Sequence, residues 1–426
     1  MVRHLSSTFI ALRHPSFRLY FVGQTISLIG TWVQSAAQAW LVYRMTSSPL
    51  LLGLSGFMGQ IPVLFLGLFG GVVADQYDRH RTVLLTQTLS MVQALILAGL
   101  VLTGKIQVWE IFMFGLFLGT VNAFDQPARQ SFFIEMVGKE DLPNAIALNS
   151  SAVNLARLIG PVVAGLLIGL VGEGICFLIN ALSFLALVVG LLLIKVTPIP
   201  KLERKESVFS YLRAGVRYGT QTPLIRRALI LLSIVSLMAL PYPYLLPVFS
   251  RMVLKGDADI YGLVMGGVGL GALLGTLSMA RQRAKSLEWV IFEASLGTGI
   301  FFILFAFSNT ILISFTLMVG MGYCLLSHSV ATNTLIQSVV PNTFRGRLMS
   351  FYGLVVLGIS PFGSLLAGYL VQRLGAPRTI LFSGIILVLG SLTYYAQSFI
   401  KVSLEGAAGS GDPTSGEIVR QQGRDR

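Results

Sequence analysis

The chain has 426 residues, of which 54% are hydrophobic and only 12% are charged, and its mean hydropathy is +0.76. A soluble domain carries about 25% charged residues, so this composition excludes an ordinary water-soluble protein and indicates one embedded in lipid. The formal net charge is +13. Because the basic residues lie in short segments between apolar runs, we attribute this excess to membrane topology and expect no nucleic-acid partner.

Twelve apolar runs along the chain are long enough to cross a membrane, since about 20 apolar residues form one spanning helix. They cover residues 17–42, 50–74, 82–103, 107–128, 143–170, 174–195, 226–250, 259–280, 287–307, 310–336, 345–373 and 376–398. The first run is too long for a cleavable signal and no small-residue cleavage site follows it, so we expect it to remain in the protein. The predicted fold is an all-α integral membrane protein with twelve transmembrane helices.

The distribution of Lys and Arg predicts the orientation of these helices. Of the 31 basic residues, 24 lie in the N-terminal segment, the even-numbered connections and the C-terminal segment, counting residues near the span ends. Six lie in the odd-numbered connections, and Arg157 lies within span five. This asymmetry predicts a multi-pass protein of the plasma (inner) membrane with both termini in the cytoplasm.

The longest connection divides the chain into two halves. Residues 196–225, rich in Lys, Arg, Glu and Pro, form a predicted cytoplasmic linker between six-helix bundles at 17–195 and 226–398. Residues 1–16 form a cytoplasmic N-terminal segment, and residues 399–426, with Gly, Ser and mixed charge, are predicted to be a disordered cytoplasmic tail.

The two halves are also related in sequence. At an offset of 203 residues, seven of 39 positions in and around spans five and eleven are identical, and these include Gly160 with Gly363, Gly165 with Gly368 and Gly172 with Gly375. This correspondence is the one expected for two parallel six-helix repeats related by an axis along the membrane normal.

The connection after span two reads Gly71-Val-Val-Ala-Asp75-Gln-Tyr-Asp78-Arg79-His-Arg81. It resembles the signature G-x-L-A-D-R-x-G-R-K of the major facilitator superfamily, with Gln76 in place of Arg and Asp78 in place of Gly. Gly71 permits close helix approach, and Asp75 at a helix end can interact with a helix N-terminus or an arginine. The resemblance implies that the loop steadies one conformational state; the alternative is a turn whose charges serve topology alone.

Span five contains Arg157-Leu-Ile-Gly160-Pro161-Val-Val-Ala164-Gly165. This run resembles the G-P-x-x-G-G signature of proton-coupled exporters of the superfamily, with Ala164 in place of the first paired glycine. Gly and Pro here favour tight, kinked packing, and an ordinary packing kink is the alternative. Together with residues 12–20, 124–130 and 144–165, the chain resembles the branch that contains the bacterial enterobactin exporter, over most of residues 9–400.

Few charged residues lie within the spans, where a charge at the bilayer centre costs about 2.5–3.5 kcal/mol on insertion scales. Arg157 is interpreted as an anchor for an anionic substrate, as the partner of a titrating acid, or as half of a fixed ion pair. Asp125 can pair with Arg79 or Arg129, and the resemblance implies a gating relay with Asp75; proton binding and a solvated helix end are the alternatives.

Two further residues are candidates for proton coupling. Glu293 lies in span nine, where its carboxylate can alternatively reach back to basic residues before that span. His328 lies in span ten and has a side chain that titrates near neutral pH, although it is also readable as a hydrogen-bonded packing residue.

A stripe of polar residues runs along span one at steps of three and four, which places them on one helical face. These residues are Gln24, Ser27, Thr31, Gln34 and Gln38. A polar stripe in a membrane helix faces a water-filled cavity or another helix. We predict that it lines the substrate cavity, with Trp32 and Trp40 available for stacking, and keep interhelical hydrogen bonding as the alternative. Proline residues near 241–247 also predict an interruption of span seven.

The chain contains no phosphate-binding G-x-x-x-x-G-K-[ST] run, no metal-ligand cluster and no nucleophile paired with a base. We therefore expect no enzyme activity, no cofactor and no metal. The predicted protein is a secondary active transporter that works as a monomer by alternating access and exports an amphipathic small molecule, siderophore-like or drug-like, in exchange for protons. A nutrient importer on the same fold is the first alternative, and a membrane receptor is the second.

Overall fold

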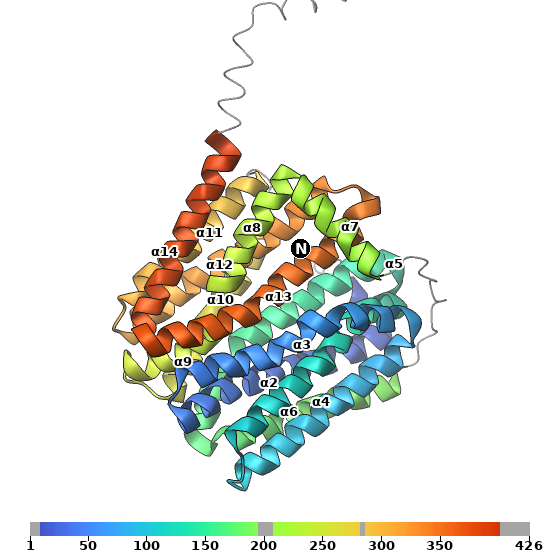
Figure 1. Ribbon diagram of the computed structural model, residues 1–426. Coiled ribbons are helices and arrows are strands. Elements are labelled where there is room, and N and C mark those ends of the chain that lie inside the picture. The colour runs from blue at the N-terminus through green and yellow to red at the C-terminus, as the bar shows by residue number, and fades with distance from the viewer. Residues whose placement is uncertain (1–8, 195–207, 282–285, 401–426) are drawn as a thin grey trace, which may run out of the picture.

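The computed structural model describes residues 9–194, 208–281 and 286–400, and these are almost entirely helical, with no strand among them. The predicted disordered tail lies largely outside the described residues, as do residues 1–8 and the linker positions 195–207. Figure 1 shows two groups of helices side by side, one from each half of the chain. The all-α fold predicted from the sequence is therefore confirmed.

The first half contains a short 3-10 turn and five α-helices that provide six crossings. They are η1 (Ile10–Arg13), α2 (Pro15–Thr46), α3 (Pro49–Gln76), α4 (Arg79–Leu102), α5 (Val108–Val171) and α6 (Glu173–Leu193). Helix α5 is 64 residues long and turns back at Gly138, whose φ of 73° and ψ of 179° are not helical. Because the chain reverses there, α5 supplies both the fourth and the fifth crossing.

The second half begins after α7 (Val208–Gln221), a helix that lies within the predicted linker. Its helices are α8 (Pro223–Met238), α9 (Tyr242–Met252), α10 (Ala258–Arg281), α11 (Leu287–Ala306), α12 (Ile311–Val339), α13 (Asn342–Leu374) and α14 (Ala376–Tyr395), followed by a π turn at Ala396–Ile400. Helices α8 and α9 form one crossing that is interrupted where Pro241 precedes α9, as the prolines predicted. The halves together make twelve crossings.

Local sequence explains where several helices begin. Pro15, Pro49 and Pro223 occupy the first turns of α2, α3 and α8, where the missing N–H of proline costs no helical hydrogen bond. Asp78 caps α4 by accepting a hydrogen bond from the backbone N–H of Arg81 at 3.0 Å, and Ser48 caps α3 in the same way. These caps satisfy donors that the first helical turn leaves free.

The repeated glycines occupy equivalent places in the two halves. Gly172 and Gly375 end α5 and α13 with φ of 84° and 83°, a region that favours glycine. Gly165 packs on α10 and Gly368 packs on α3, so each contacts the opposite half: the ideal Cβ of either residue would lie 2.6 Å or less from a backbone oxygen. The 203-residue repeat therefore builds the two interfaces that join the halves.

The apolar core is continuous at one end of the molecule and divided at the other. We call the end that carries α7, the Gly138 turn and the start of α2 the linker end, and the opposite one the far end (Figure 1). At the far end, one cluster takes in residues of both halves, including Trp40 and Tyr261. At the linker end, the cluster around Phe132 belongs to the first half, whereas those around Ile291 and Leu348 belong to the second. The halves thus join at the far end and separate at the linker end.

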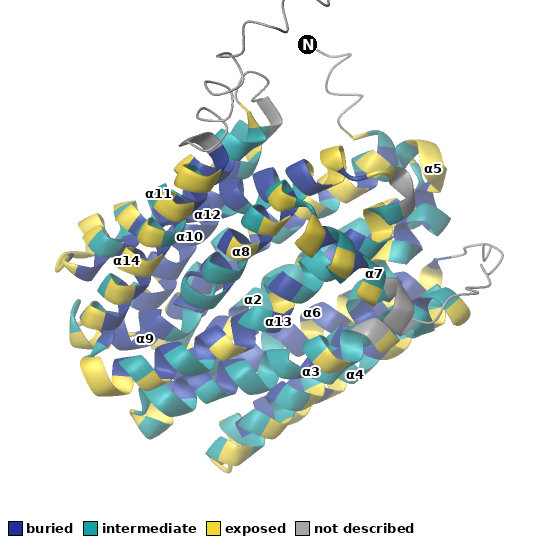
Figure 2. Cartoon of the chain, turned by 45° about the horizontal axis from the view of Figure 1, so that its top comes forward, coloured by how far each residue is buried: buried dark blue, intermediate teal, exposed yellow. Residues whose placement is uncertain are grey.

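Many residues on the outward faces of the helices are exposed (Figure 2), and large apolar side chains are among them. Leu170, Phe307 and Leu312 are each more than 70% exposed. Among the described residues, ten helical stretches are long and apolar enough to cross a membrane; α5 is one of these and crosses twice, and α8 with α9 counts as one. The twelfth crossing is α2, which is not among the ten. Such a surface fits hydrocarbon, because lipid tails solvate apolar side chains without cost.

Candidate functional site

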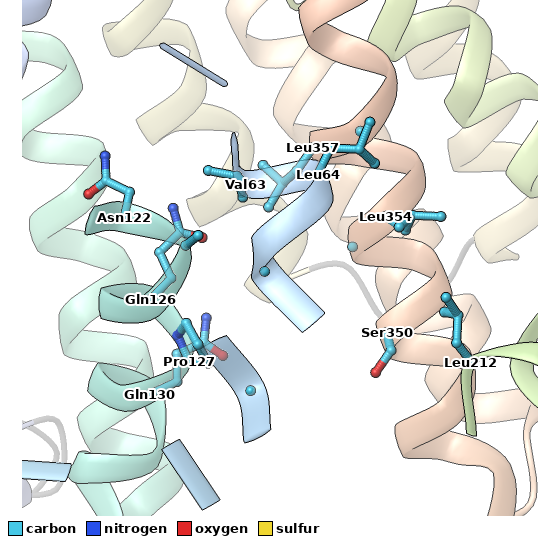
Figure 3. Close-up of a pocket in the computed structure, with 15 residues that line it drawn as sticks. Val63, Leu64, Asn122, Gln126, Pro127, Gln130, Leu212, Ser350, Leu354 and Leu357 are labelled. Atoms are coloured by element: carbon cyan, nitrogen blue, oxygen red, sulfur yellow. The ribbon is translucent and has the colours of Figure 1, made fainter. Parts of the chain in front are cut away.

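A cavity of about 280 Å³ opens at the linker end between the two halves. It lies between α3 and α5 of the first half and α13 of the second, with α7 at its side (Figure 3). Its lining residues are Val63, Leu64, Gly67, Gly71, Asn122, Ala123, Gln126, Pro127, Gln130, Leu212, Ser350, Gly353, Leu354, Leu357 and Gly358. The cavity occupies the space left where the apolar core divides.

The two sides of this cavity differ in chemistry. Three amide side chains, Asn122, Gln126 and Gln130, follow one another at four-residue steps along α5 and line one side. Leu354 and Leu357 of α13 lie on the other side (Figure 3). An amide wall offers hydrogen-bond donors and acceptors, whereas a leucine wall offers only apolar surface, so the cavity suits an amphipathic molecule.

Sequence reasoning missed this amide wall, although a signal for it is present. Asn122, Gln126 and Gln130 recur at helical spacing, which is the same pattern that singled out the stripe of span one. The pattern was hidden because Gln130 lies beyond the predicted end of span four at residue 128.

The polar stripe of α2 is packed between helices in this conformation and does not line the cavity. Gln34 is buried, donates to Gln93 of α4 at 3.2 Å and accepts from Asn180 of α6 at 2.8 Å. Gln24 and Ser27 are also buried, and the Thr31 hydroxyl donates to the Ser27 carbonyl within α2. Gln34 therefore makes interhelical hydrogen bonds, which was the alternative to lining the cavity. Buried amide groups need such partners when water is excluded.

Gln38 points toward α5, where its Nε2 atom lies 3.7 Å from the ideal Cβ position of Gly115. The sequence predicted one face for the whole stripe, and the structure shows that Gln34 and Gln38 on this face meet neighbouring helices of the same half.

The loop after α3 is held by an ion pair that sequence reasoning did not include. Arg79 donates to Glu135 at 2.8 Å and to the backbone oxygen of Ala74 at 3.1 Å. The Arg79 and Glu135 side chains are only 14% and 7% exposed. Asp75 lies half-buried at the end of α3. The pair connects the loop to the stretch of α5 just before its turn, so α3, α4 and α5 are coupled at the linker end.

Gly71 lines the cavity and does not make the close helix contact predicted for it. A Cβ atom at Gly71 would meet nothing within 4 Å, whereas one at the preceding Gly70 would lie 2.0 Å from the backbone oxygen of Ala123. The close approach of α3 to α5 therefore depends on Gly70, because a helix places successive residues on different faces.

Asp125 is buried inside the first half and pairs with Arg129 at 2.6 Å. It also accepts hydrogen bonds from Thr86 at 2.7 Å and Gln87 at 2.8 Å, both on α4. Two partners were predicted for Asp125, and Arg129 is the one with which it pairs. The other, Arg79, pairs with Glu135 instead. Asp125 is 1% exposed, so it is not a solvated helix end.

The network around Asp125 extends to α2. The Tyr20 hydroxyl lies beside the Arg129 guanidinium and donates to Gln24 at 3.3 Å. The network therefore links three helices through polar groups that are buried except for Arg129, whose side chain is 20% exposed. Such networks rigidify a protein when every member has a partner.

The Gly-Pro run of span five lies where α5 meets both α2 and α10. A Cβ at Gly160 would lie 2.4 Å from Trp32 Cβ, and one at Gly165 would lie 2.6 Å from the backbone oxygen of Ala258. The carbonyl of Pro161 faces Gly262 of α10. The run thus packs the two halves together, and the backbone dihedral angles at Pro161 are helical.

Arg157 stands one turn before this run and faces aromatic side chains. Its Cζ atom lies 5.2 Å from the centre of the Trp32 ring, and Tyr242 of α9 is within its electrostatic reach. Its buried Nε has no hydrogen-bond partner, and no ion pair involves it in the part of the chain that the structure describes. None of the described acidic residues therefore pairs with Arg157, as a fixed ion pair would require.

The proton-coupling candidates lie apart from the linker-end cavity. Glu293 is exposed and accepts a hydrogen bond from the Trp289 indole at 2.7 Å. Of the basic residues that it was predicted to reach, those at 283 and 285 lie outside the described residues. His328 is completely buried, and its Nδ1 lies 3.4 Å from the carbonyl of Ile291.

The far end is closed by aromatic packing beneath a second, charged cavity. Trp40 of α2 stacks on Tyr261 of α10, with ring centres 5.8 Å apart. Outside this stack is a cavity of about 440 Å³ whose lining includes Arg44, Glu173 and Arg251. Because Trp40 and Tyr261 come from different halves, their contact holds the halves together at this end.

Two helical bundles with a cavity open at one end and an aromatic closure at the other define a membrane transporter of the alternating-access class. The family model described as transmembrane secretion effector matches residues 6–412. The chain belongs to this family, which is a branch of the major facilitator superfamily.

The chain is similar over almost its whole length to characterised transporters. It is 25% identical over 382 residues to the staphyloferrin A transporter of Staphylococcus aureus (strain NCTC 8325 / PS 47), covering 89% of this chain and 95% of that one. It is 26% identical over 397 residues to the enterobactin exporter EntS of Salmonella typhimurium (strain LT2), covering 90% and 95%. The fold also matches the crystal structure of the nucleoside transporter NupG, with a TM-score of 0.74 at 12% identity over 90% of this chain and 98% of that one.

Proposed function

We propose that this protein exports an amphipathic small molecule, siderophore-like or drug-like, from the cytoplasm in exchange for protons. It does so as a monomer in the plasma (inner) membrane with both termini in the cytoplasm. The observation that carries the proposal is the cavity at the linker end, which has one wall of amides and one of leucines. At the opposite, far end the two halves are packed together. With the linker end in the cytoplasm, this conformation is ready to load cargo from inside.

Small residues on the facing helices support a rocking motion. At the far end, α3 and α13 already touch through Gly53 and Gly368, where the ideal Cβ of Gly53 would lie 2.9 Å from the Gly368 Cα. At the linker end, the same two helices present Gly67 and Gly353 to the cavity, and a Cβ on either would meet nothing closer than 3.9 Å. Glycine faces let helices approach closely in a membrane, so the linker end can close when the far end opens.

The relatives support the direction of transport, because one of them is described as an exporter. The Gly-Pro run also supports export through its resemblance to proton-coupled exporters. The Arg79–Glu135 pair and the network around Asp125 are the groups that we assign to stabilising the open linker end. The titrating side chain that exchanges the proton is one of Asp125, Glu293 and His328.

The test uses inside-out membrane vesicles that contain the protein and an amphipathic fluorescent dye, Hoechst 33342. An acidic vesicle interior should drive accumulation of dye, and collapse of the gradient by nigericin in potassium buffer should abolish it. Vesicles without the protein are the control. Accumulation in right-side-out vesicles alone would contradict export and favour the nutrient importer. Absence of gradient-dependent flux across a panel of amphipathic compounds would contradict the proposal as a whole.

A further inference from the structure

One half-buried cation, midway along span five, lacks an anionic partner among the described residues. In that part of the chain, the ion pairs at 4.0 Å or less are made by Arg44, Arg79, Arg81, Arg129 and His14. Arg157 makes none, and its buried Nε has no hydrogen-bond partner. Arginine does not lose its proton in proteins, and ionisable groups at this depth are expensive to keep. Such a group calls for a ligand that brings the missing negative charge.

The surroundings of Arg157 describe the rest of that ligand. The guanidinium lies against the face of Trp32, with Cζ 5.2 Å from the ring centre. The absent side chain of Gly160 allows the α2 backbone at Trp32 to approach α5, since a Cβ there would lie 2.4 Å from Trp32 Cβ. Tyr242, within electrostatic reach of Arg157, comes from the second half. The charge therefore has a flat aromatic neighbour on one side and the other half of the transporter nearby.

We propose that Arg157 and Trp32 form a binding subsite for a carboxylate carried on a flat ring, and that the natural cargo, for which a dye is only a surrogate, contains such a group. This inference rests on the proposed export function and names a substrate class for a subsite between α2 and α5, formed by residues other than those that line the linker-end cavity. A guanidinium fork binds a carboxylate through two parallel charge-assisted hydrogen bonds. The ring of the ligand packs on the indole, because aromatic pairs gain from offset or edge contacts.

The test measures binding with one fluorescent reporter. The chain has four tryptophans, and substitution of Trp40, Trp109 and Trp289 by Phe leaves Trp32 alone. The probes are 4-bromobenzoate and 4-bromobenzamide, which share a ring and differ in charge; their bromine quenches indole fluorescence on contact. In purified protein, we expect saturable quenching by the carboxylate at a concentration about tenfold or more below that needed for the amide, as a charge-assisted pair predicts.

Variants at Arg157 decide whether that preference comes from this side chain. Arg157→Gln should bind the two probes equally. Arg157→Lys keeps the charge and should keep the preference with weaker binding, since an ammonium lacks the planar fork; it serves if the Gln variant does not fold. Arg213→Gln, on the exposed face of α7, removes the same charge elsewhere and should change nothing.

Equal quenching by the two probes, no saturable quenching, or an unchanged preference in Arg157→Gln would each overturn the proposal. The measurement is made at equilibrium and needs no proton gradient. Its failure would therefore leave gradient-driven dye export standing, and failure of export would leave carboxylate binding standing.

Discussion

Two adjacent glycines at the end of α3 give the sharpest test of how the linker end is built. Gly70→Ala places a methyl group 2.0 Å from the Ala123 oxygen and 3.1 Å from the Phe124 Cα. Because carbon atoms pack at about 3.5–4.0 Å, the α3 and α5 backbones must separate by about 1.5 Å. Overpacking of this kind costs about 1–3 kcal/mol. Because backbone atoms cannot rotate away from the new methyl group, we expect a cost near the upper end of that range.

Gly71→Ala is the matched control because it makes the same chemical change one residue later. Its methyl group meets nothing within 4 Å, and replacing a helical glycine by alanine stabilises by about 0.4–1 kcal/mol. The two variants should therefore differ by about 2 kcal/mol or more, with Gly70→Ala the less stable.

Thermal unfolding of the purified variants, followed by tryptophan fluorescence and by size-exclusion chromatography after heating, measures this difference. Gly71→Ala should in addition slow Hoechst 33342 export, because its methyl group enters the cavity. If Gly71→Ala were the less stable variant, or if Gly70→Ala unfolded like the parent, the assignment of the close contact to Gly70 would be refuted.

Three further substitutions test the linker end. Glu135→Gln leaves Arg79 buried beside a neutral partner and should lower the free energy of unfolding by about 1–3 kcal/mol, measured by thermal unfolding; no loss would show that the pair is dispensable. Gln126→Leu should raise the dye concentration at half-maximal export by several-fold and leave the melting temperature near that of the parent, whereas unchanged kinetics would remove the amide wall from the binding site. Asp75→Asn should impair dye export at near-normal folded abundance, and undiminished flux would argue against gating by Asp75.

The candidate residues differ in how far their partners could be foreseen. Asp125 and Arg129 are four residues apart on one helix, so helical spacing alone makes them neighbours. The pair of Arg79 with Glu135 spans 56 positions, and nothing in the local pattern selects Glu135 among the acids of the chain. Pairing over such distances depends on how helices are arranged and not on spacing.

The polar stripe of α2 shows the same limit in another form. Periodicity correctly placed Gln34 on a polar face, but it does not say whether that face meets water or a neighbouring helix. The structure gives Gln34 two partners on α4 and α6. The amide wall that does face the cavity lies on α5, where the same spacing rule applies.

The sequence by itself predicted the twelve crossings, the two related halves and the glycines that repeat between them, whereas the contacts through which these glycines join the halves came from the structure. Apolar segment length and loop charge are local properties, and they set membrane insertion and orientation without reference to distant residues. Tertiary structure alone decided that the linker end is open, that Gly70 rather than Gly71 makes the close contact, and that Arg157 faces Trp32 without an anion among the described residues. Each of these depends on which faces of distant helices meet, and a one-dimensional pattern leaves that choice undetermined.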